Sequence, residues 1–448
     1  MTDANDVEMK EEEIEDESES EESSEDEGDE VEEEEKQAYI PGLSRPLKKG
    51  EGLDFDPSVY KVFHTFTTDW PCLSFDVVPD GLGENRTTFP AECYIVSGTQ
   101  AEKDRDNEIV VMGLKNLSEM RPPKEAKGDD SDTSEDESED EDEESIKKRE
   151  PIMHGMIIPH FGSINRVRAE RLGDSTVCAC WNAQGRVQIW NITEALNSVH
   201  LMKGGKQSQE MKGRSLFTHN GTGKEGYGLA WSSLKKGDLA TGDIIRKIFI
   251  WQMKEGGEWA VGSTPLTGHK KSIEDLAWSP TENGLLASCS SDQSIKLWDT
   301  RANPKEACVC TVNKAHDSDV NVISWNRHDN LIVSGGDDGE LKIWSLKTIQ
   351  FGQPVARFKY HSGPITSVEW HPQETTTFMA SSEDDQTTIW DIATEADGAN
   401  TIEGVPPQLM FVHMGQKEVK EVHWHPQIPG LAINTSIDGF NVFKTINI

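Results

Sequence analysis

The chain has 448 residues and a formal net charge of −37, from 81 acidic and 44 basic residues. Residues 1–35 contain 21 Asp or Glu and one Lys, and residues 129–144 contain 12 acids and no base, so these stretches carry −20 and −12. The other 397 residues therefore carry only −5. This distribution excludes the basic footprint of a nucleic-acid-binding protein and predicts either a basic protein partner or a solubilising role for the acidic stretches.

The length is compatible with two or three domains of about 150 residues, or with one closed β-rich architecture. No apolar run reaches the ~20 residues that span a bilayer. The amino-terminal residues also lack the basic and apolar regions of a signal peptide. We therefore expect an intracellular protein that has no membrane segment.

Two acidic segments, residues 1–38 and 121–150, are predicted to be disordered because they have almost no apolar content. Several Ser and Thr residues in them precede an acidic residue by three positions, which favours acidophilic kinases. Phosphate groups there would add negative charge. The candidate phosphorylation sites are Ser18, Ser23, Ser24, Thr133, Ser134 and Ser138.

Residues 39–68 are predicted to form a linker followed by an N-terminal helix over 57–67. Asp56 and Pro57 resemble an N-cap and the first helical position. Apolar residues at helical spacing then define one face of the helix. These residues are Val59, Val62, Phe63 and Phe66.

After the predicted helix, the chain changes to strand patterns. Three strands are predicted within residues 72–78, 91–100 and 107–114, which are rich in β-branched and aromatic side chains. From residue 151 to the end the chain consists of short apolar segments separated by turns. Residues 69–448 are therefore predicted to form one β domain, interrupted by the acidic insertion 121–150.

The part of the chain from residue 151 to the end is a repeat. A Trp or Phe ends a strand at steps of 61, 47, 46, 46 and 53 residues, and a His precedes each by 28 to 32 residues. In the three most regular copies an Asp lies six residues before the Trp and is expected to meet the His as a structural pair. The strand-ending aromatics are Trp190, Trp251, Trp298, Trp344, Trp390 and Phe443. The expected pairs are His269 with Asp292, His316 with Asp338, and His361 with Asp384.

A repeat of this length fits four short strands that cannot bury both faces of their sheet alone. Six repeats and the three preceding strands give seven blades, and ring closure removes exposed sheet edges. The sequence thus predicts an all-β fold, a seven-bladed β-propeller with an N-terminal helix and disordered acidic segments.

No motif for catalysis or cofactor binding stands out. The sequence has no P-loop, no nucleophile elbow, no H-E-x-x-H pair and no EF-hand loop. His423 and His425 lack a third metal ligand, and the x+2 pairs Cys178/Cys180 and Cys308/Cys310 are expected to be buried structural thiols. We therefore expect no catalytic residue, metal or cofactor, and a protein that is not an enzyme.

The clearest repeat copy contains GHKKSIEDLAWSP and SSDQSIKLWD, and it resembles WD repeats. Three further segments resemble the WD-repeat histone chaperones that bind retinoblastoma protein: VFHTFTTDWPCLSFDVVPD, KEGYGLAW and GVPPQLMFVHMG. Three further features resemble the glutamate-rich group of WD-repeat proteins that act in ribosome biogenesis. They are the acidic N-terminal segment, the sequence AYIPG that follows it, and the acidic insertion 121–150. The resemblance implies a seven-bladed WD-repeat β-propeller.

The resemblance also implies a nuclear and nucleolar chaperone for basic proteins, with histones, large-subunit ribosomal proteins and pre-ribosomal particles as partners. In such chaperones the top face of the propeller holds a basic peptide, with acids and amides around the channel. Ser163, Pro364 and Thr366 depart from the chaperone pattern and place an identical histone-tail specificity in question. The matching top-face positions are Asn165, Arg166, Glu225, Tyr227, Glu274 and Asn321.

A second site is implied between the N-terminal helix and the loop 395–407, as a groove for a basic amphipathic helix. The alternative interpretation is that the helix only seals the propeller and the loop is a solvated connection. The groove residues would be Phe63, Phe66, Glu395, Asp397, Glu403, Pro406 and Pro407.

Two other functions remain open from the sequence. One is a substrate-receptor adaptor of a cullin ubiquitin ligase, since LWDTR places Asp299 and Arg301 in a weak match to a ligase-docking pattern. The other is a structural scaffold of pre-ribosomal particles. Sequence-specific binding to nucleic acid and binding to membranes are not expected.

Overall fold

The computed structural model describes residues 39–41, 43–45, 48, 54–120, 149–395 and 404–447, which belong to two units, 1–52 and 53–448. In the first unit the backbone turns at Ile40, whose carbonyl accepts the Ser44 N–H at 2.8 Å. The second unit contains all the described strands. No helix in the described part of the chain has the length and apolar content to cross a membrane.

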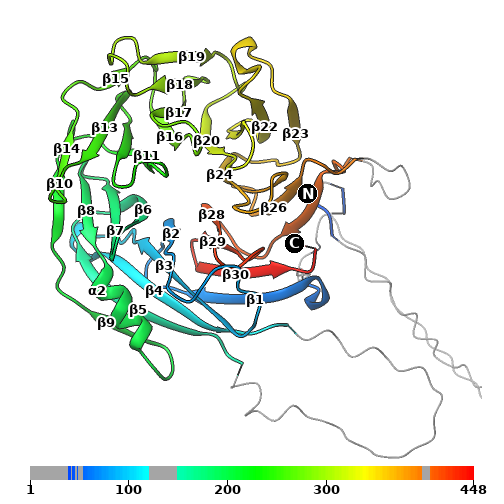
Figure 1. Cartoon of the computed structure of the whole chain (residues 1–448). Helices are drawn as coiled ribbons and strands as arrows, with labels where there is room; N and C mark the ends of the chain where they lie inside the picture. The colour runs from blue at the N-terminus through cyan, green and yellow to red at the C-terminus, as the bar shows by residue number, and fades with distance from the viewer. Residues whose placement is uncertain are drawn as a thin grey trace, which may run out of the picture. The chain divides into compact units, whose positions relative to one another are not determined.

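The described strands form seven sheets around a common axis (Figure 1). We number these blades from the first sheet that the chain completes. Blade 1 contains β2 (Ser74–Val77), β3 (Ala91–Gly98), β4 (Asn107–Leu117), β5 (Ile152–His160) and β9 (Gln207–Glu210). Blade 2 contains β6 (Ile164–Leu172), β7 (Ser175–Asn182), β8 (Val187–Asn191) and β10 (Ser215–His219). Blade 3 contains β11 (Gly226–Trp231), β12 (Leu239–Asp243), β13 (Lys247–Met253), β14 (Trp259–Val261) and β15 (Leu266–Thr267).

The remaining four blades have four strands each, so the seven-bladed fold class is confirmed. Blade 4 contains β16 (Ile273–Trp278), β17 (Leu285–Ser290), β18 (Ile295–Asp299) and β19 (Cys308–Val312). Blade 5 contains β20 (Val320–Trp325), β21 (Leu331–Gly336), β22 (Glu340–Ser345) and β23 (Ala356–Lys359). Blade 6 contains β24 (Ile365–Trp370), β25 (Thr377–Ser382), β26 (Thr387–Asp391) and β27 (Leu409–His413). Blade 7 contains β28 (Glu421–Trp424), β29 (Ala432–Ser436), β30 (Gly439–Thr445) and β1 (Tyr60–Thr67). The strands nearest the centre are β2, β6, β11, β16, β20, β24 and β28 (Figure 1).

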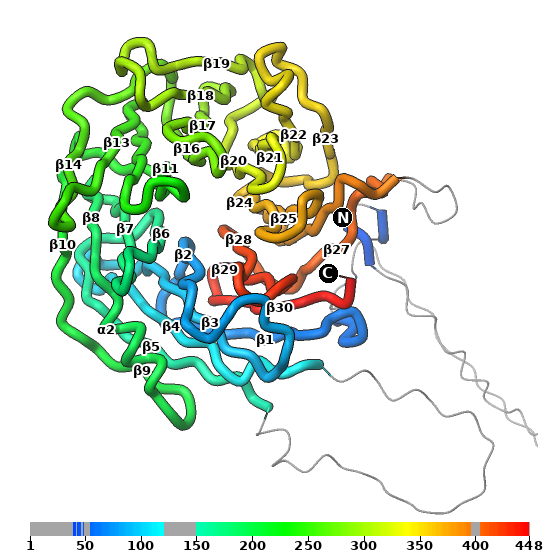
Figure 2. The backbone as a smooth tube through the Cα atoms, viewed as in Figure 1, coloured from blue at the N-terminus to red at the C-terminus, as the bar shows by residue number. Residues whose placement is uncertain are grey.

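The predicted helix over 57–67 is wrong. Asp56 does cap a helical start, accepting the Ser58 N–H at 2.8 Å, but only the 3-10 turn η1 (Pro57–Val59) follows. The next residues form β1, which pairs antiparallel with β30, so the first and last strands of the ring share one sheet (Figure 2). The segment is rich in aromatic and β-branched residues, and its pairing with the C-terminal strand overrides the helical spacing.

The helices in the described residues lie elsewhere. The one α-helix there is α2 (Thr193–Leu201), which buries Ala195 and Val199 against blade 1 and blade 2 side chains. The short 3-10 turns are η2 (Asp104–Asp106) and η3 (Ile349–Phe351). The predicted disordered segments 1–38 and 121–150 lie outside the described residues, except for Arg149 and Glu150.

The hydrophobic core lies between neighbouring blades. The three N-terminal strands expected from the sequence are β2, β3 and β4. Phe75 of β2 packs edge-on against Phe440 of β30 at a centroid distance of 5.4 Å, which joins blade 1 to blade 7. Burial of such side chains is the dominant favourable contribution to folding.

Three blades bring the repeat His and Asp together. His269 Nδ1 lies 3.1 Å from Asp292, while its Nε2 lies 2.7 Å from the Ser288 hydroxyl, which also accepts the Trp298 indole N–H at 2.8 Å. The repeat pattern did not identify this hydroxyl, which connects the buried Trp to the turn. The equivalent sets are His316, Asp338, Ser334 and Trp344 in blade 5, and His361, Asp384, Thr388 and Trp390 in blade 6.

The innermost strands need acceptors for the N–H groups that face the axis, because no strand pairs with them there. Side chains of the preceding blade supply them. Asp275 accepts the Ile323 N–H at 3.1 Å, and Glu421 accepts the Phe75 N–H at 2.8 Å across the closure of the ring. The other acceptor and donor pairs are Ser74 with Val167, Asp76 with Ala169, Ser324 with Trp370, Ser367 with Val422 and Glu369 with Trp424.

Candidate functional site

The top-face candidates lie at the starts of the inner strands β6, β11, β16 and β20. The Asn165 amide donates to the Glu225 carboxylate at 3.2 Å, which links blade 2 to blade 3. Arg166 Nε donates to the Tyr227 carbonyl at 3.0 Å in the same way. The packing of neighbouring blades therefore brings residues that are about 60 positions apart into direct contact.

Asn321 belongs to the same face but is already engaged. Its amide donates to the Asp337 carboxylate at 2.8 Å and to the Ile365 carbonyl at 3.0 Å. Thr366 of the next blade is also engaged, since its hydroxyl bonds to Ser381 and to a backbone carbonyl. This part of the face consists of paired polar groups.

Negative charge accumulates on the Glu225–Glu274 side of the top face. Burial raises the pKa of Tyr227, and the nearby charges of Glu225 and Glu274 raise it further. Burial also raises the pKa of Glu274, and the charge of Asp319 adds to that effect. A cation placed here would interact favourably with the carboxylates of Glu225 and Glu274.

The top-face candidate Arg166 is committed to an ion pair. Its Nη1 lies 2.8 Å from Glu421 Oε1, and the same oxygen lies 2.6 Å from Arg168 Nη2. The two guanidiniums hold the pKa of Glu421 well below its usual range, although burial acts in the opposite direction. Because Arg166 is only 13% exposed, it orients its neighbours and does not present a free charge.

Arg166 and Glu421 belong to an ionic cluster on the inner strands that also contains Arg168 and His423. The sequence analysis did not identify Arg168, Glu421 or His423 as members of such a cluster. His423 Nδ1 lies 3.1 Å from Glu369, and its Nε2 lies 3.6 Å from Glu421. The two carboxylates raise the pKa of His423 to about 10 despite its burial. The signal available in the sequence was the presence of charged residues within the innermost strands β6 and β28, where apolar residues are expected.

The helix-groove site is not formed as expected, because Phe63 and Phe66 lie on strand β1. Phe66 is buried in the core between blades 1 and 7. Phe63 stacks on Tyr60 at 5.0 Å and contacts His413 edge-on at 5.5 Å, so both phenylalanines seal the ring. Glu395 is exposed, and Pro406 and Pro407 are half-buried before β27.

Several other predicted positions lie outside the described residues. They are Asp397, Glu403 and the six candidate phosphorylation sites Ser18, Ser23, Ser24, Thr133, Ser134 and Ser138.

In the LWDTR segment, Trp298 is buried, while Asp299 and Arg301 form an ion pair at 2.8 Å on the surface. Of the thiols expected to be buried, Cys178 and Cys180 are buried, but Cys308 is exposed on the outermost strand of blade 4.

Comparison with protein families gives two matches. Residues 50–118 match the family of the histone-binding protein RBBP4 and its counterpart in the CAF1 complex. Residues 261–299, 306–345 and 352–391 match the WD domain, G-beta repeat. These repeats end in blades 4, 5 and 6, which contain the three complete His–Asp pairs.

Three curated proteins are similar over most of this chain. Ribosome assembly protein rrb1 of Schizosaccharomyces pombe is 37% identical, over 99% of this chain and 91% of its own length. Protein HEAT STRESS TOLERANT DWD 1 of Arabidopsis thaliana is 39% identical, over 92% of each chain. Glutamate-rich WD repeat-containing protein 1 of Dictyostelium discoideum is 40% identical, over 90% of this chain and 83% of its own length. With this similarity and a seven-bladed propeller, the chain belongs to the glutamate-rich WD-repeat family that includes ribosome assembly protein rrb1.

Proposed function

We propose that this protein is a non-enzymatic chaperone for basic nuclear proteins, namely histones and newly made large-subunit ribosomal proteins, and acts in ribosome biogenesis and chromatin. The names of the fungal and Dictyostelium relatives and the histone-binding family match support this proposal. We place the protein in the nucleus and, for its ribosomal role, in the nucleolus.

One observation on the top face carries the proposal. Glu225, Tyr227 and Glu274 come from two neighbouring blades and lie close together at the starts of β11 and β16. The charges of Glu225 and Glu274 both reach Tyr227 and raise its pKa beyond the effect of burial, so the phenol stays protonated between two carboxylates. An extended Lys- or Arg-rich segment would pair with the two carboxylates and form charge-assisted hydrogen bonds.

The acidic stretches 1–35 and 129–144 would act differently. Their combined charge of −32 provides a long-range attraction for basic clients, because exposed charges act over about a Debye length. The top face would supply the short-range contacts that the acidic stretches lack. Pre-ribosomal particles are then the destination of the ribosomal clients.

The test is a charge reversal at the top face, Glu225→Lys with Glu274→Lys. The matched control is Glu255→Lys with Glu258→Lys, which makes the same charge change at exposed positions of the β13–β14 hairpin. Binding of a fluorescent histone-tail peptide and of purified large-subunit ribosomal proteins is measured by anisotropy at about 0.15 M salt.

We expect the affinity of the top-face variant to fall at least about tenfold and the affinity of the control to fall less than about fivefold. Equal losses in both variants would show that only net charge matters and would refute a top-face site. Melting curves of both variants establish that they are folded.

A further inference from the structure

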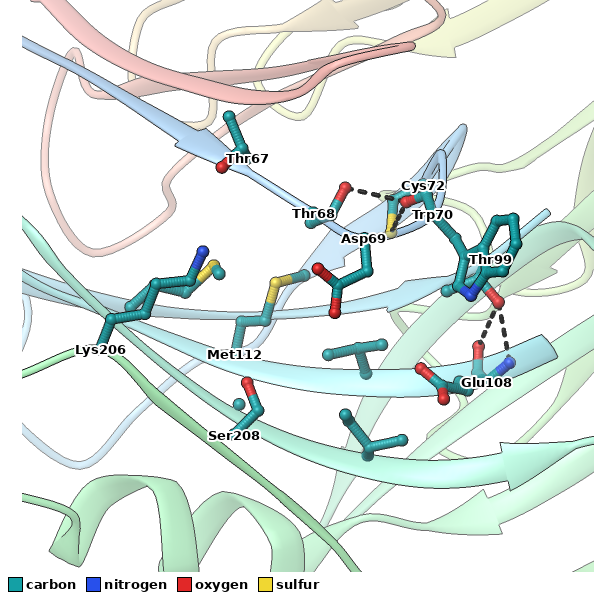
Figure 3. Close-up of a pocket in the computed structure, with 14 residues that line it drawn as sticks. Thr67, Thr68, Asp69, Trp70, Cys72, Thr99, Glu108, Met112, Lys206 and Ser208 are labelled. Carbon is teal, nitrogen blue, oxygen red and sulfur yellow. Dashed lines mark hydrogen bonds between the residues drawn. The ribbon is translucent and has the colours of Figure 1, made fainter. Parts of the chain in front are cut away.

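A pocket lies between blade 1 and the connection from β1 to β2. Blade 1 has the fifth strand β9, which pairs parallel with β5, whereas blade 7 has only four strands. The sheet of blade 1 therefore extends farther from the propeller axis than β1, the outermost strand of blade 7. The segment Thr67–Cys72, which follows β1, forms one wall of the pocket (Figure 3).

The pocket wall formed by this segment is fixed by hydrogen bonds. The Thr68 hydroxyl donates to the Trp70 carbonyl at 2.9 Å, and the Gln100 N–H donates to the Pro71 carbonyl at 2.9 Å. The pocket is therefore formed before any ligand binds.

Two carboxylates enter this pocket from different elements. Asp69 lies in the connection and Glu108 on β4, and both line the pocket together with Trp70 (Figure 3). Among the described residues, neither carboxylate has an ion pair or a side-chain hydrogen bond. Burial raises the pKa of Glu108, and the charges of Asp69 and Glu210 raise it further.

The remaining lining suits the hydrocarbon part of a side chain. Met112 and Met153 form the floor with Val110, and the half-buried Trp70 stands at the acidic end. Lys206, the one basic lining residue, is exposed at the opposite end (Figure 3). The volume of about 60 Å³ admits the end of one side chain and is far below the ~300 Å³ of a small-molecule site.

We propose that this pocket binds the cationic end of one Lys or Arg side chain of a basic client protein, between Asp69, Glu108 and the face of Trp70. The two carboxylates would neutralise the cation, the indole would add a cation–π contact, and the methionines would cover the aliphatic stem. This site is separate from the top face, and it relies on the proposed function only for the kind of client.

The experiment observes the pocket directly. Met112 and Met153 line it, so ¹³C spectra of their ε-methyl groups in the full chain report its occupancy without interference from the top face. The probes are Nα-acetyl-lysine methylamide, the corresponding arginine compound and the uncharged norleucine analogue.

The test variant is Asp69→Asn with Glu108→Gln. The matched control is Glu102→Gln with Asp174→Asn, which removes two exposed carboxylates elsewhere on blades 1 and 2. Melting curves are recorded for both variants.

We expect the Met112 and Met153 signals to shift with the lysine or the arginine probe, to remain unchanged with norleucine, and to lose the shift only in the test variant. The stronger of the two cationic probes identifies the preferred side chain. Shifts of the same size with norleucine would show an apolar crevice, and no shift with either cation would overturn the proposal.

Client binding separates this proposal from the proposed function. The pocket variant should weaken binding of a basic client by about tenfold, which is the effect of one charge-assisted contact. If the client binds at the top face but the methyl signals do not move, the pocket proposal fails and the proposed function stands. If the methyl signals move with cations but no basic client binds, the function fails and the pocket remains a cation site.

Discussion

Glu421 on β28, the innermost strand of blade 7, contacts Arg168 of blade 2 at 2.6 Å, across the intervening blade 1. The other carboxylate oxygen of Glu421 accepts the Phe75 N–H of blade 1 at 2.8 Å. A single side chain thus joins three blades at the place where the ring closes. The hydrogen bonds between β1 and β30 close the same ring at its outer edge.

Glu421→Gln should strongly destabilise the propeller. The change keeps the shape but leaves Arg166, Arg168 and His423 without their shared anion, and breaking a buried pair costs about 3–5 kcal/mol. The measurement is the free energy of unfolding in urea. Glu418→Gln, an exposed position three residues earlier, should stay within ~0.5 kcal/mol of the parent. Equal unfolding midpoints for both variants would contradict the closure role of Glu421.

Asp292→Ala, Asp338→Ala and Asp384→Ala should each lower the melting temperature. Each carboxylate accepts from a buried His and from a backbone N–H, and an unpaired buried donor costs about 1–3 kcal/mol. Asp317→Ala, at an exposed position, is the control. Unchanged melting temperatures in all three variants would mean that these pairs do not stabilise the turns.

The pH dependence of stability should reveal His423. Its folded-state pKa of about 10 lies above the ordinary 6.5, so its contribution is complete below pH 6.5 and is lost as the pH rises toward 10. The melting temperature of the parent should therefore fall more steeply than that of His423→Gln between about pH 6.5 and 9.5. Parallel curves for the two proteins would show that His423 is not held protonated.

Deletion of residues 1–35 and 129–144 should weaken client binding mainly at low salt. Exposed charges are screened within about 8 Å at physiological ionic strength, so the affinities of the full and the deleted chain should converge as salt is added. The melting temperature should hardly change, because neither stretch overlaps a described strand. Equal affinities at low salt would assign only a solubilising role to the acidic stretches.

The sequence predicted the propeller well because its repeat spacing reflects a local structure. The His, Asp and Trp of one blade lie within about 30 residues of each other, so their pattern is visible without the fold. The strand β1 was mistaken for a helix because its structure depends on Phe443 and its neighbours at the other end of the chain. Local spacing carries no information about such a distant partner.

The top-face residues lie at or next to the starts of the inner strands, but their individual contacts could not be predicted from the sequence. The sequence alone suggests that Arg166 and Glu225 are equally free to bind a ligand. In the structure Arg166 is bound to Glu421, which lies 255 positions away. The pocket beside Trp70 was not identified, because it depends on how far the fifth strand of blade 1 extends past blade 7.

The central claim is that the top face holds a basic segment of the client, and photo-cross-linking tests it most directly. A benzophenone amino acid is introduced in place of Tyr227 and, as a control, in place of Phe351, which is 70% exposed on η3. After irradiation with a basic client, mass spectrometry locates the cross-linked residues. Cross-links from position 227 to a Lys- or Arg-rich client segment, with few from position 351, are the predicted result. Equal yields from both positions, or cross-links from position 351 alone, would contradict the account.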